Sequence, residues 1–464
     1  MSKKASLSNA RRKRKLPTSN GVKTLITTKN TLSRSLNAVR RAQKGEAGVE
    51  STVRTIIAKV RSGGDKVLFE LTRKFDGAAL KSLLVMKSEI QKAYKNESAE
   101  VVRALKRAKK NIEKFHTQSL KKNESAVETE KGVSVWREFR PIERVGLYIP
   151  GGKAAYPSTV LMLGVPARVA GCKEIILCVP PNKEGEVPSA VLVAADLCGI
   201  SSIYKIGGAQ AIAAMAYGTE TIPKVSKIFG PGNQYVTTAK LLVYGEVDID
   251  MPAGPSEVLA FADSTANPAW IAADLLSQLE HGEDSQAILV TTAESVANNV
   301  RAEIAKQLPA LKRKLIIEQS LKKSFAIVAD TFSTAVAFIN EYAPEHLEIV
   351  LKDETKALKA INNAGSIFLG PYASEPLGDY ATGANHTLPT SGYAKMFSAL
   401  SAESFGKKIQ VQKVSEQGIR NLRNTVEVLA EREGLGAHKN AVSIRFTPLE
   451  AKYQRPDSKI AKKY

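Results

Sequence analysis

Residues 144–179 read RVGLYIPGGKAAYPSTVLMLGVPARVAGCKEIILCV, and this stretch decides the fold class. Two short β-rich runs, at residues 144–149 and 174–179, flank a segment of helical character at about residues 157–170. A strand, a helix and a second strand in this order are typical of a parallel β-α-β unit. The stretch therefore predicts a parallel sheet that is covered by helices.

The same alternation continues along the chain in two series. The first series is expected to contain strands at residues 144–149, 174–179, 202–206 and 227–229, with helices near residues 157–170, 188–197 and 209–217. The second is expected to contain strands at residues 257–262, 286–291, 325–329 and 366–369, with helices near residues 267–281, 293–307, 331–341 and 353–361. This order predicts two parallel sheets, each with helices on both faces.

The flanking regions differ from these two series. Residues 1–30 show no apolar periodicity and are expected to be unstructured. Helical spacing of apolar residues runs through residues 46–75, and Gly63-Gly64 is expected to divide it into two helices. A further helix, basic on one face, is expected at about residues 87–120, and a helix-rich tail is expected from about residue 401.

The composition fits a globular chain of two or three domains. The 464 residues are 43% hydrophobic and 24% charged, which is close to the usual globular mix. No apolar run reaches the roughly 18 residues of a membrane helix, and residues 1–21 lack the apolar core of a secretion signal. Cys172, Cys178 and Cys198 form no CxxC motif, which favours a reducing compartment. We therefore expect a cytoplasmic protein without a membrane segment.

The positive charge is confined to the first third of the chain. Residues 1–150 contain 35 Lys and Arg against 14 Asp and Glu, and residues 151–464 contain 32 of each kind. The neutral body argues against a nucleic-acid-binding protein, in which basic residues line one face. The cluster at residues 11–15 (RRKRK) could be a localisation tag or a contact for an anionic surface. We interpret it as a solvated tail, because no aromatic residues that could stack on bases lie between the charges.

Two pairs of residues stand out as candidates for chemistry. Gln278 and His281 lie three apart near the end of an expected helix and so share one face, where they could hold a metal or form a polar helix end. Glu345 and His346 follow Pro344 directly before an apolar run. Glu and His can act as acid and base near neutral pH, although a surface turn with a solvated His remains the alternative. His116, in a basic helix, is interpreted as a surface or packing residue.

Two further segments carry histidines. The glycine-punctuated loop at residues 377–390 contains Asp379 and His386 and suits close contact with a ligand. Glu433 and His438 follow the last long helix. Gln278, His281, Asp379 and His438 would together supply two nitrogens and two oxygens, a set that suits Zn²⁺.

Common cofactor and metal motifs are missing from the sequence. It contains no HExxH, no Walker A and no GxGxxG motif. The nearest match to GxGxxG is GPGNQY at residues 230–235, which lacks the last glycine. Gly151-Gly152 and Gly207-Gly208 follow expected strands and precede helices, where phosphate groups bind. A Gly-Gly pair after a strand is more often a simple turn, and we favour that interpretation for both pairs.

Taken together, these segments resemble the histidinol dehydrogenase family from about Val49 to Val442. The matching blocks occur in the family's order and include GDKVLFELTRKFDG (64–77), RVGLYIPGG (144–152), IGGAQAIAAMAYGTE (206–220), KIFGPGN (227–233), DIDMPAGPSEVL (248–259), DLLSQLEHGEDSQ (274–286), YAPEHLEI (342–349), GDYATGANHTLPT (378–390) and AHKNAV (437–442). The departures from the family are the basic N-terminal extension and the Lys-rich C-terminal tail.

The resemblance implies an α/β fold with two incomplete Rossmann-like, doubly wound domains, a helical N-terminal arm and a small C-terminal helical tail. The implied parts are a basic arm (1–45), a substrate and zinc domain (46–147 with 258–400), an NAD-binding domain (148–257) and a dimerisation tail (401–464). The implied reaction is the oxidation of L-histidinol to L-histidine through histidinal with two NAD⁺. It also implies a homodimer whose two subunits share the active sites.

The resemblance implies a role for each matched polar residue. The implied zinc ligands are Gln278, His281, Asp379 and His438. The implied catalytic pair is Glu345 and His346. The implied substrate contacts are Ser256, His386 and Glu433, together with Gln278, His281, His346, Asp379 and His438. The implied NAD contacts are Tyr148, Gln210 and Asn233. The alternatives are an enzyme for another primary alcohol, a nucleic-acid-binding protein and a catalytically inactive scaffold.

Overall fold

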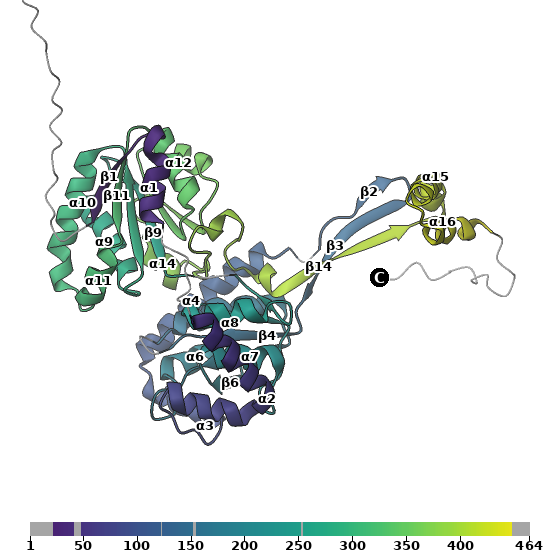
Figure 1. Cartoon of the computed structure of the whole chain (residues 1–464), viewed down its shortest axis with the longest axis horizontal. Coiled ribbons are helices and arrows are strands. Elements are labelled where there is room, and N and C mark those ends of the chain that lie inside the picture. The colour runs from purple at the N-terminus through teal and green to yellow at the C-terminus, as the bar shows by residue number, and fades with distance from the viewer. Residues whose placement is uncertain (1–21, 41–47, 122, 152–154, 252–253, 448–464) are drawn as a thin grey trace, which may run out of the picture. The chain divides into compact units, whose positions relative to one another are not determined.

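The computed structural model describes residues 22–40, 48–121, 123–151, 155–251 and 254–447. Contacts divide the chain into two compact units (Figure 1). Unit 1 comprises Met1–Ser119 and Ile142–Phe405, and unit 2 comprises Leu120–Pro141 and Gly406–Tyr464. The cluster at residues 11–15 and the Lys-rich C-terminus lie outside the described residues.

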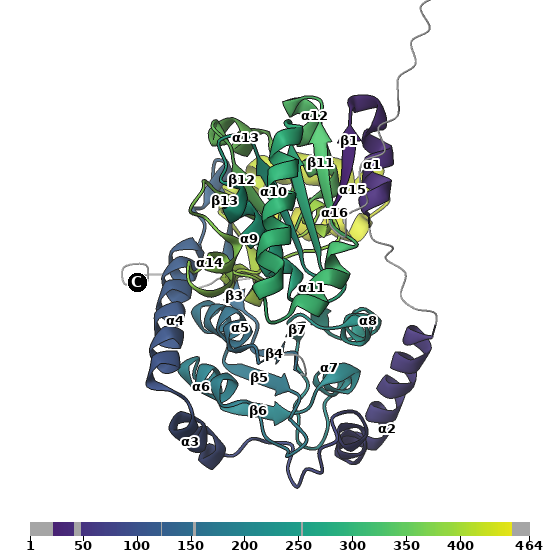
Figure 2. The ribbon, with the colours of Figure 1, turned by 90° about the vertical axis from the view of Figure 1, so that its left-hand side faces the viewer.

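The first sheet of unit 1 has five parallel strands in the order β6-β5-β4-β7-β8. The strands are β4 (Arg144–Tyr148), β5 (Glu174–Val179), β6 (Ser202–Lys205), β7 (Lys227–Phe229) and β8 (Asp248–Ile249). The helices between them are α5 (Pro157–Ala170), α6 (Ser189–Leu197), α7 (Gly208–Tyr217) and α8 (Gln234–Val243). Figure 2 shows α5 and α6 on one side of the strands and α7 and α8 on the other. The strand order reverses between β4 and β7, so a crevice for ligands is expected at their carboxyl ends.

Three further helices lie against the helices of this sheet. They are α2 (Val49–Phe75), α3 (Lys87–Asn96) and α4 (Ala99–Ser119). Helix α2 packs on α7 and α8, whereas α3 and α4 pack on α5 and α6. The predicted break in the first helix is confirmed, because Gly64 has a positive φ of 51° inside α2. The single helix expected at residues 87–120 is instead two helices.

The second sheet of unit 1 has six parallel strands in the order β1-β11-β10-β9-β12-β13. The strands are β1 (Lys23–Thr27), β9 (Glu257–Ala262), β10 (Gln286–Thr291), β11 (Phe325–Ala329), β12 (His346–Val350) and β13 (Ser366–Leu369). The helices are α1 (Leu32–Val39), α9 (Pro268–Leu279), α10 (Glu294–Gln307), α11 (Lys314–Leu321), α12 (Phe332–Tyr342), α13 (Glu354–Ala360) and α14 (Glu375–Tyr380). Successive residues of its strands enter two separate apolar cores, one on each face.

The predicted α/β class with parallel sheets is confirmed, and the expected strands of both series are present within one or two residues. One expectation is wrong. Residues 23–27 are not unstructured but form β1, which pairs in parallel with β11. The run KTLIT is rich in β-branched residues, but it is too short and too close to the basic segment to show a period.

Unit 2 contains a three-stranded antiparallel sheet and two helices. The strands are β2 (Val127–Glu130), β3 (Val133–Pro141) and β14 (Gly406–Val414), and the helices are α15 (Glu416–Arg432) and α16 (Gly436–Ser443). Strand β14 pairs with β3 along its whole length. The expectation that the chain beyond residue 401 is mainly helical is therefore incomplete, because its first long element is a strand. That strand carries Lys and Gln between its apolar residues and is largely exposed, so it lacks the continuous apolar run of a buried strand.

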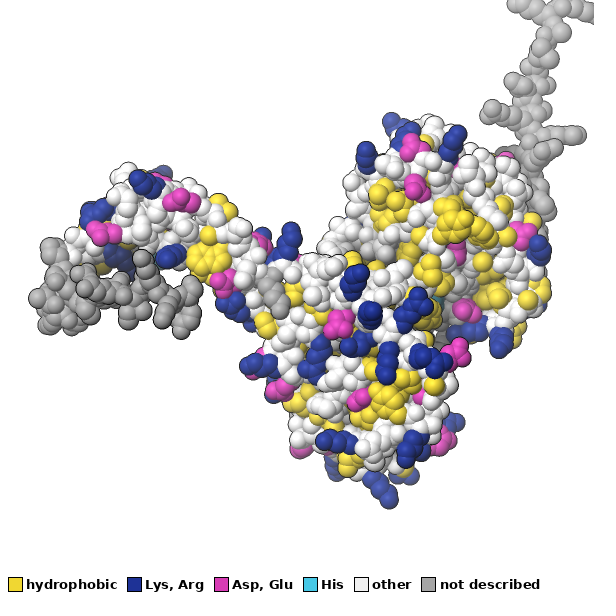
Figure 3. Space-filling view, turned by 180° about the vertical axis from the view of Figure 1, so that it is seen from behind, with side chains coloured by type: hydrophobic (Ala, Val, Ile, Leu, Met, Phe, Trp, Pro, Cys, Tyr) yellow, Lys and Arg dark blue, Asp and Glu magenta, His cyan; other side chains and the backbone are white. Residues whose placement is uncertain are grey.

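The surface of the described chain carries both signs of charge. Figure 3 shows many Lys and Arg side chains, with Asp and Glu side chains among them. Several of the basic side chains form ion pairs, such as Lys92 with Glu186 and Lys224 with Glu246. Exposed pairs of this kind add little stability, but they compensate the positive charge locally. Among the described helices, none combines the length and the apolarity needed to cross a membrane.

His116 is a packing residue of α4. Its side chain is fully buried, and within the described chain neither ring nitrogen has a hydrogen-bond partner. The neighbouring Phe115 ring meets the imidazole edge to face, with 5.2 Å between the ring centres. Burial lowers the pKa of His116 to about 4, so the folded protein holds this imidazole in its neutral form.

The protein is therefore expected to lose stability on acidification through this one residue. Between the unfolded pKa of about 6.5 and the folded pKa, the unfolded chain binds more protons, so the free energy of unfolding falls as the pH falls. From pH 7 to pH 5 this amounts to about 2 kcal/mol. His116→Leu should remove this part of the pH dependence, as measured by urea unfolding at both pH values. Identical pH slopes in the two proteins would contradict the assignment.

Candidate active site

Glu345 and His346 lie at the amino end of the six-stranded sheet, where β12 begins beside β9. Glu345 Oε2 accepts a hydrogen bond of 2.7 Å from the backbone N–H of Glu257. His346 Nδ1 lies 2.9 Å from the backbone oxygen of the same residue. Because a carbonyl oxygen can only accept, Nδ1 must carry the proton. The other ring nitrogen, Nε2, is then free to accept a proton.

The surroundings of His346 keep its imidazole neutral. The side chain is buried, and burial lowers its pKa while the Asp379 carboxylate opposes this effect. Nε2 forms no hydrogen bond within the described residues. It lies 3.8 Å from Asp379 Oδ1 and 4.0 Å from Glu375 Oε1. A buried imidazole with an available lone pair is suited to act as a general base.

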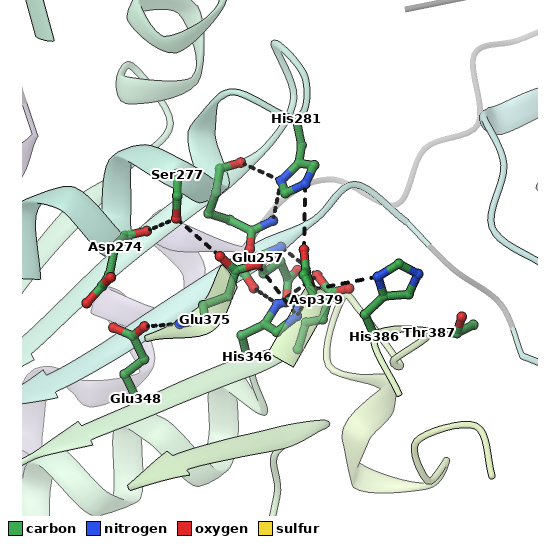
Figure 4. A network of polar contacts seen from close by, with 12 residues as sticks. Glu257, Asp274, Ser277, His281, His346, Glu348, Glu375, Asp379, His386 and Thr387 are labelled. Carbon is green, nitrogen blue, oxygen red and sulfur yellow. Dashed lines mark hydrogen bonds and ion pairs between the residues drawn. The ribbon is translucent and has the colours of Figure 1, made fainter. Parts of the chain in front are cut away.

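Asp379 is the centre of a cluster that unites three histidines (Figure 4). His281 Nε2 lies 3.9 Å from Asp379 Oδ2, and His386 Nδ1 lies 3.8 Å from Asp379 Oδ1. Burial lowers the pKa of His386, whereas the Asp379 carboxylate raises it. The short helix α14 presents Asp379, and Asn385 anchors the following loop by donating a 2.6 Å hydrogen bond to the Met162 backbone oxygen. The sequence placed these groups on separate segments, and the fold brings them together.

Gln278 lies in the last turn of α9, whereas His281 lies two residues beyond the helix, which ends at Leu279 and not at residue 281 as expected. Gln278 Nε2 lies 3.2 Å from His281 Nδ1, which leaves Nε2 of His281 facing Asp379. Gln278 Oε1 is buried and accepts no hydrogen bond within the described part of the chain. A buried carbonyl oxygen without a donor is costly, so this atom marks a place for a cation.

Glu375 is a member of the cluster that sequence reasoning missed. Its side chain is 1% exposed, and Oε2 accepts a 3.1 Å hydrogen bond from Ser277. Burial, reinforced by Asp379, raises the pKa of Glu375 to about 10. The available signal was the spacing of Glu375 and Asp379, four residues apart, because two acids on one helix face are unfavourable unless something binds them.

A second candidate metal group therefore exists beside the predicted one. Ligand atoms of His346, Glu375 and Asp379 all lie within 4.8 Å of one another. Burial raises the pKa of Glu375 to about 10, so a metal that bound Glu375 would displace its proton. The set of Gln278, His281 and Asp379 has an unsatisfied oxygen and an imidazole nitrogen directed at a carboxylate. We favour this set.

Behind the cluster lies a second row of acids. Glu348 Oε1 accepts the backbone N–H of Glu375 at 2.9 Å, and Asp274 Oδ1 accepts a hydrogen bond of 2.6 Å from Ser374. Burial raises the pKa of both acids. These contacts fix the start of α14, so they hold Asp379 in place.

The predicted cofactor residues lie at the carboxyl end of the five-stranded sheet. The Tyr148 hydroxyl, at the end of β4, accepts a 3.1 Å hydrogen bond from Gly208 N–H at the start of α7. Gln210 is buried in the first turn of the same helix. Asn233 is exposed and caps α8, accepting hydrogen bonds from Tyr235 and Val236. These positions surround the reversal of strand order between β4 and β7, where nucleotides bind in such folds.

The remaining predicted residues fall in two places. Ser256 is half-buried directly before Glu257, so it lies beside the Glu345 and His346 pair. Glu433 ends α15 and His438 lies on α16, and both are exposed in unit 2. Gly152, in one of the predicted glycine pairs, lies outside the described residues.

Comparisons with known proteins agree on one family. The family model described as histidinol dehydrogenase matches residues 39–446. The histidinol dehydrogenase of Bacteroides fragilis (strain YCH46) is 54% identical over 396 residues, which cover 85% of this chain and 92% of the relative. That of Methanothermobacter thermautotrophicus is 50% identical over 409 residues, covering 88% and 96%. The crystal structure of histidinol dehydrogenase from Elizabethkingia anophelis superposes with a TM-score of 0.89 at 48% identity, covering 91% of this chain and 98% of that one.

Proposed function

The chain belongs to the histidinol dehydrogenase family, and from this premise we propose that it oxidises L-histidinol to L-histidine through histidinal. The balanced reaction consumes one water and two NAD⁺ and yields two NADH and three protons. The observation that carries the proposal is the buried His346 imidazole, whose protonated Nδ1 faces a carbonyl and whose Nε2 lone pair faces the Asp379 cluster.

In the first oxidation, His346 Nε2 accepts the hydroxyl proton of histidinol. The hydrogen bond between Nδ1 and the Glu257 carbonyl holds the ring in the tautomer that this step requires. NAD⁺, when bound, supplies the hydride acceptor. A neutral imidazole can start each cycle as the base, because burial keeps it unprotonated.

In the second oxidation, Glu345 activates the water that attacks the aldehyde, and His346 accepts the proton of the resulting diol. Glu345 Oε2 is held by the Glu257 N–H, which fixes the position of this carboxylate. The three cysteines provide no competing thiolate route, because all are buried and burial raises the pKa of each thiol. Free, buried thiols also suit a cytoplasmic location, which is part of the proposal.

The proposed NAD⁺ contacts are Tyr148, Gln210 and Asn233. The positions of Tyr148 and Asn233 at and after the carboxyl ends of β4 and β7, where the strand order reverses, support the proposal. The proposed zinc ligands are Gln278, His281 and Asp379 with His438 of a second subunit. The unbonded Gln278 Oε1 and the His281 nitrogen facing Asp379 support the zinc assignment. Zinc would act as a Lewis acid that orients the polar groups of the substrate.

The proposed substrate contacts include Ser256, His386 and Glu433, together with the zinc ligands and His346. Glu433 and His438 would serve the site of a partner subunit in a homodimer. Their exposure supports this, and so do the exposed apolar side chains of unit 2, among them Val428, Leu429 and Leu435.

The deciding experiment counts NADH formed per histidinol consumed by the zinc-loaded protein. Two NADH per substrate support the four-electron reaction, and one would mean that oxidation stops at the aldehyde. The second candidate is oxidation of another primary alcohol without an imidazole ring. Glu433 and His438, which would bind that ring, argue against it, and activity with simple amino alcohols equal to that with histidinol would favour it.

Gln278→Leu is expected to weaken zinc binding by at least roughly 10-fold, because it removes a proposed ligand oxygen without adding charge. The measurement is the zinc retained at increasing chelator concentration, followed by metal analysis and by NADH formation. Turnover should disappear as the metal leaves and return with added Zn²⁺. Gln307→Leu, on α10, removes an amide away from the cluster and serves as the control. Equal zinc retention in Gln278→Leu and wild type would remove Gln278 from the ligand set.

A further inference from the structure

A buried ion pair lies beneath the proposed cofactor crevice. Lys240 on α8 pairs with Asp250, which follows β8 directly. The Lys240 side chain is 4% exposed and that of Asp250 is 2% exposed. No role is yet assigned to either residue.

Both members of the pair bind the backbone as well as each other. Asp250 accepts hydrogen bonds of 2.7 Å from the N–H groups of Gly230 and Met251. The Lys240 ammonium lies 3.0 Å from the Gly230 backbone oxygen and 3.4 Å from that of Met251. The ammonium has three protons, and these two carbonyls and Asp250 can use all of them.

The Gly230 turn is pressed against the strand that carries Tyr148. Gly230 has a φ of 123°, and a Cβ at this position would lie 2.1 Å from the backbone oxygen of Tyr148. Only glycine permits this approach. Asn233 stands three residues later and caps α8, the helix that supplies Lys240. The pair therefore fixes the loop that runs from Gly230, which lies against Tyr148, to Asn233.

The same pair lies at the start of the connection to the second sheet. Residues 250–256 lead from the carboxyl end of β8 to the amino end of β9, where Glu257 binds both Glu345 and His346. Asp250 and Met251 are the first residues of this connection, and Ser256 is the last. A shift of the Lys240–Asp250 pair would therefore move both the Gly230–Asn233 loop and the first residues of this connection.

We propose that Lys240 and Asp250 are positioning residues that hold the Gly230–Asn233 loop in the geometry required for NAD⁺ binding and hydride transfer. The proposal rests on the proposed function, because it concerns the same cofactor site. Stability alone does not explain the pair, because apolar residues of similar size can often replace a buried ion pair without a loss of stability. What apolar residues could not replace is the set of hydrogen bonds to Gly230 and Met251.

The test separates stability from positioning with the double variant Lys240→Met/Asp250→Asn. This variant leaves no unpaired buried charge, and the Asn oxygen can still accept one backbone N–H. Its melting temperature should stay close to that of the wild type. The Kd for NAD⁺ should nevertheless rise by roughly 10-fold or more and kcat should fall, because small misplacements of a reactant are costly. The Kd for histidinol, measured without NAD⁺, should change less than about twofold, which is small beside the expected change in the Kd for NAD⁺.

Two further variants complete the experiment. Lys240→Arg keeps the charge but replaces a compact ammonium by a planar guanidinium, so it should also weaken NAD⁺ binding. This variant provides the test if the double variant does not fold. Lys205→Met/Glu89→Gln removes another shielded ion pair of unit 1, between β6 and α3, and should leave the Kd for NAD⁺ unchanged. An unchanged Kd and kcat in a folded Lys240 variant of an active enzyme would overturn the inference. A wild-type protein that neither binds NAD⁺ nor oxidises histidinol would instead contradict the proposed function.

Discussion

His346→Asn is expected to lower kcat for both histidinol and histidinal, by roughly 10²- to 10⁴-fold, the usual contribution of a general base. Glu345→Gln should lower kcat by a similar factor for histidinal but spare the oxidation of histidinol to the aldehyde. His346 is proposed to accept a proton in both oxidations, whereas Glu345 is proposed only to activate water. The two variants should therefore separate the half-reactions.

Both substitutions can preserve the hydrogen bonds to the Glu257 backbone. The Gln oxygen can still accept the Glu257 N–H, and the Asn amide can still donate to the Glu257 carbonyl. A loss of activity can then be attributed to chemistry instead of folding, once the melting temperatures are shown to match. The measurement is single-turnover NADH formation with histidinol and with histidinal. Equal slowing of both substrates by Glu345→Gln would show that Glu345 is not specific to the water step.

The sequence predicted the two parallel sheets because each strand in them is a continuous apolar run bounded by turns. Residues 174–179 and 286–291 are strands with the predicted limits, since strands buried on both faces leave a strong local signal. Strand β12 was seen only as an apolar run after Glu345. Strands β1 and β14 were missed because β1 is only five residues long and β14 is largely exposed, so that neither forms the continuous apolar run of a buried strand.

The sequence identified most residues of the candidate site but not how they are arranged in space. The spacing of Gln278 and His281 correctly brought their side chains together, although α9 ends at Leu279 and His281 lies just beyond it. The meeting of His281, His346 and His386 around Asp379 comes from the order of the strands, which no single segment encodes. Glu375 was missed because its importance lies in its burial. The Glu257 backbone, which holds both Glu345 and His346, could not be recognised from any side chain.

Mixing two inactive variants, His346→Ala and His438→Ala, is expected to restore activity to about a quarter of the wild-type value. The proposed homodimer takes Glu345, His346 and Asp379 from one subunit and Glu433 and His438 from the other. After random reassociation, half of the dimers are mixed. By the twofold symmetry of such a dimer, each mixed dimer has one site with both lesions and one intact site. Each variant alone should be inactive, because every site in it carries one lesion.

The structure of unit 2 makes this arrangement physically reasonable. His438 is exposed on α16, and α15 buries only Gly418 and Ala430 within its own chain. Exposed apolar side chains such as Val428 and Leu429 remain available to a partner. The mixture should be refolded together, and exchange of subunits should be verified with differently tagged chains. The control mixes His346→Ala with Asp379→Ala, whose lesions lie in the same subunit's contribution, so that no combination yields an intact site. The contrary result would be complete exchange of subunits in both mixtures without any activity. In that case His438 serves its own chain, and the shared site must be abandoned.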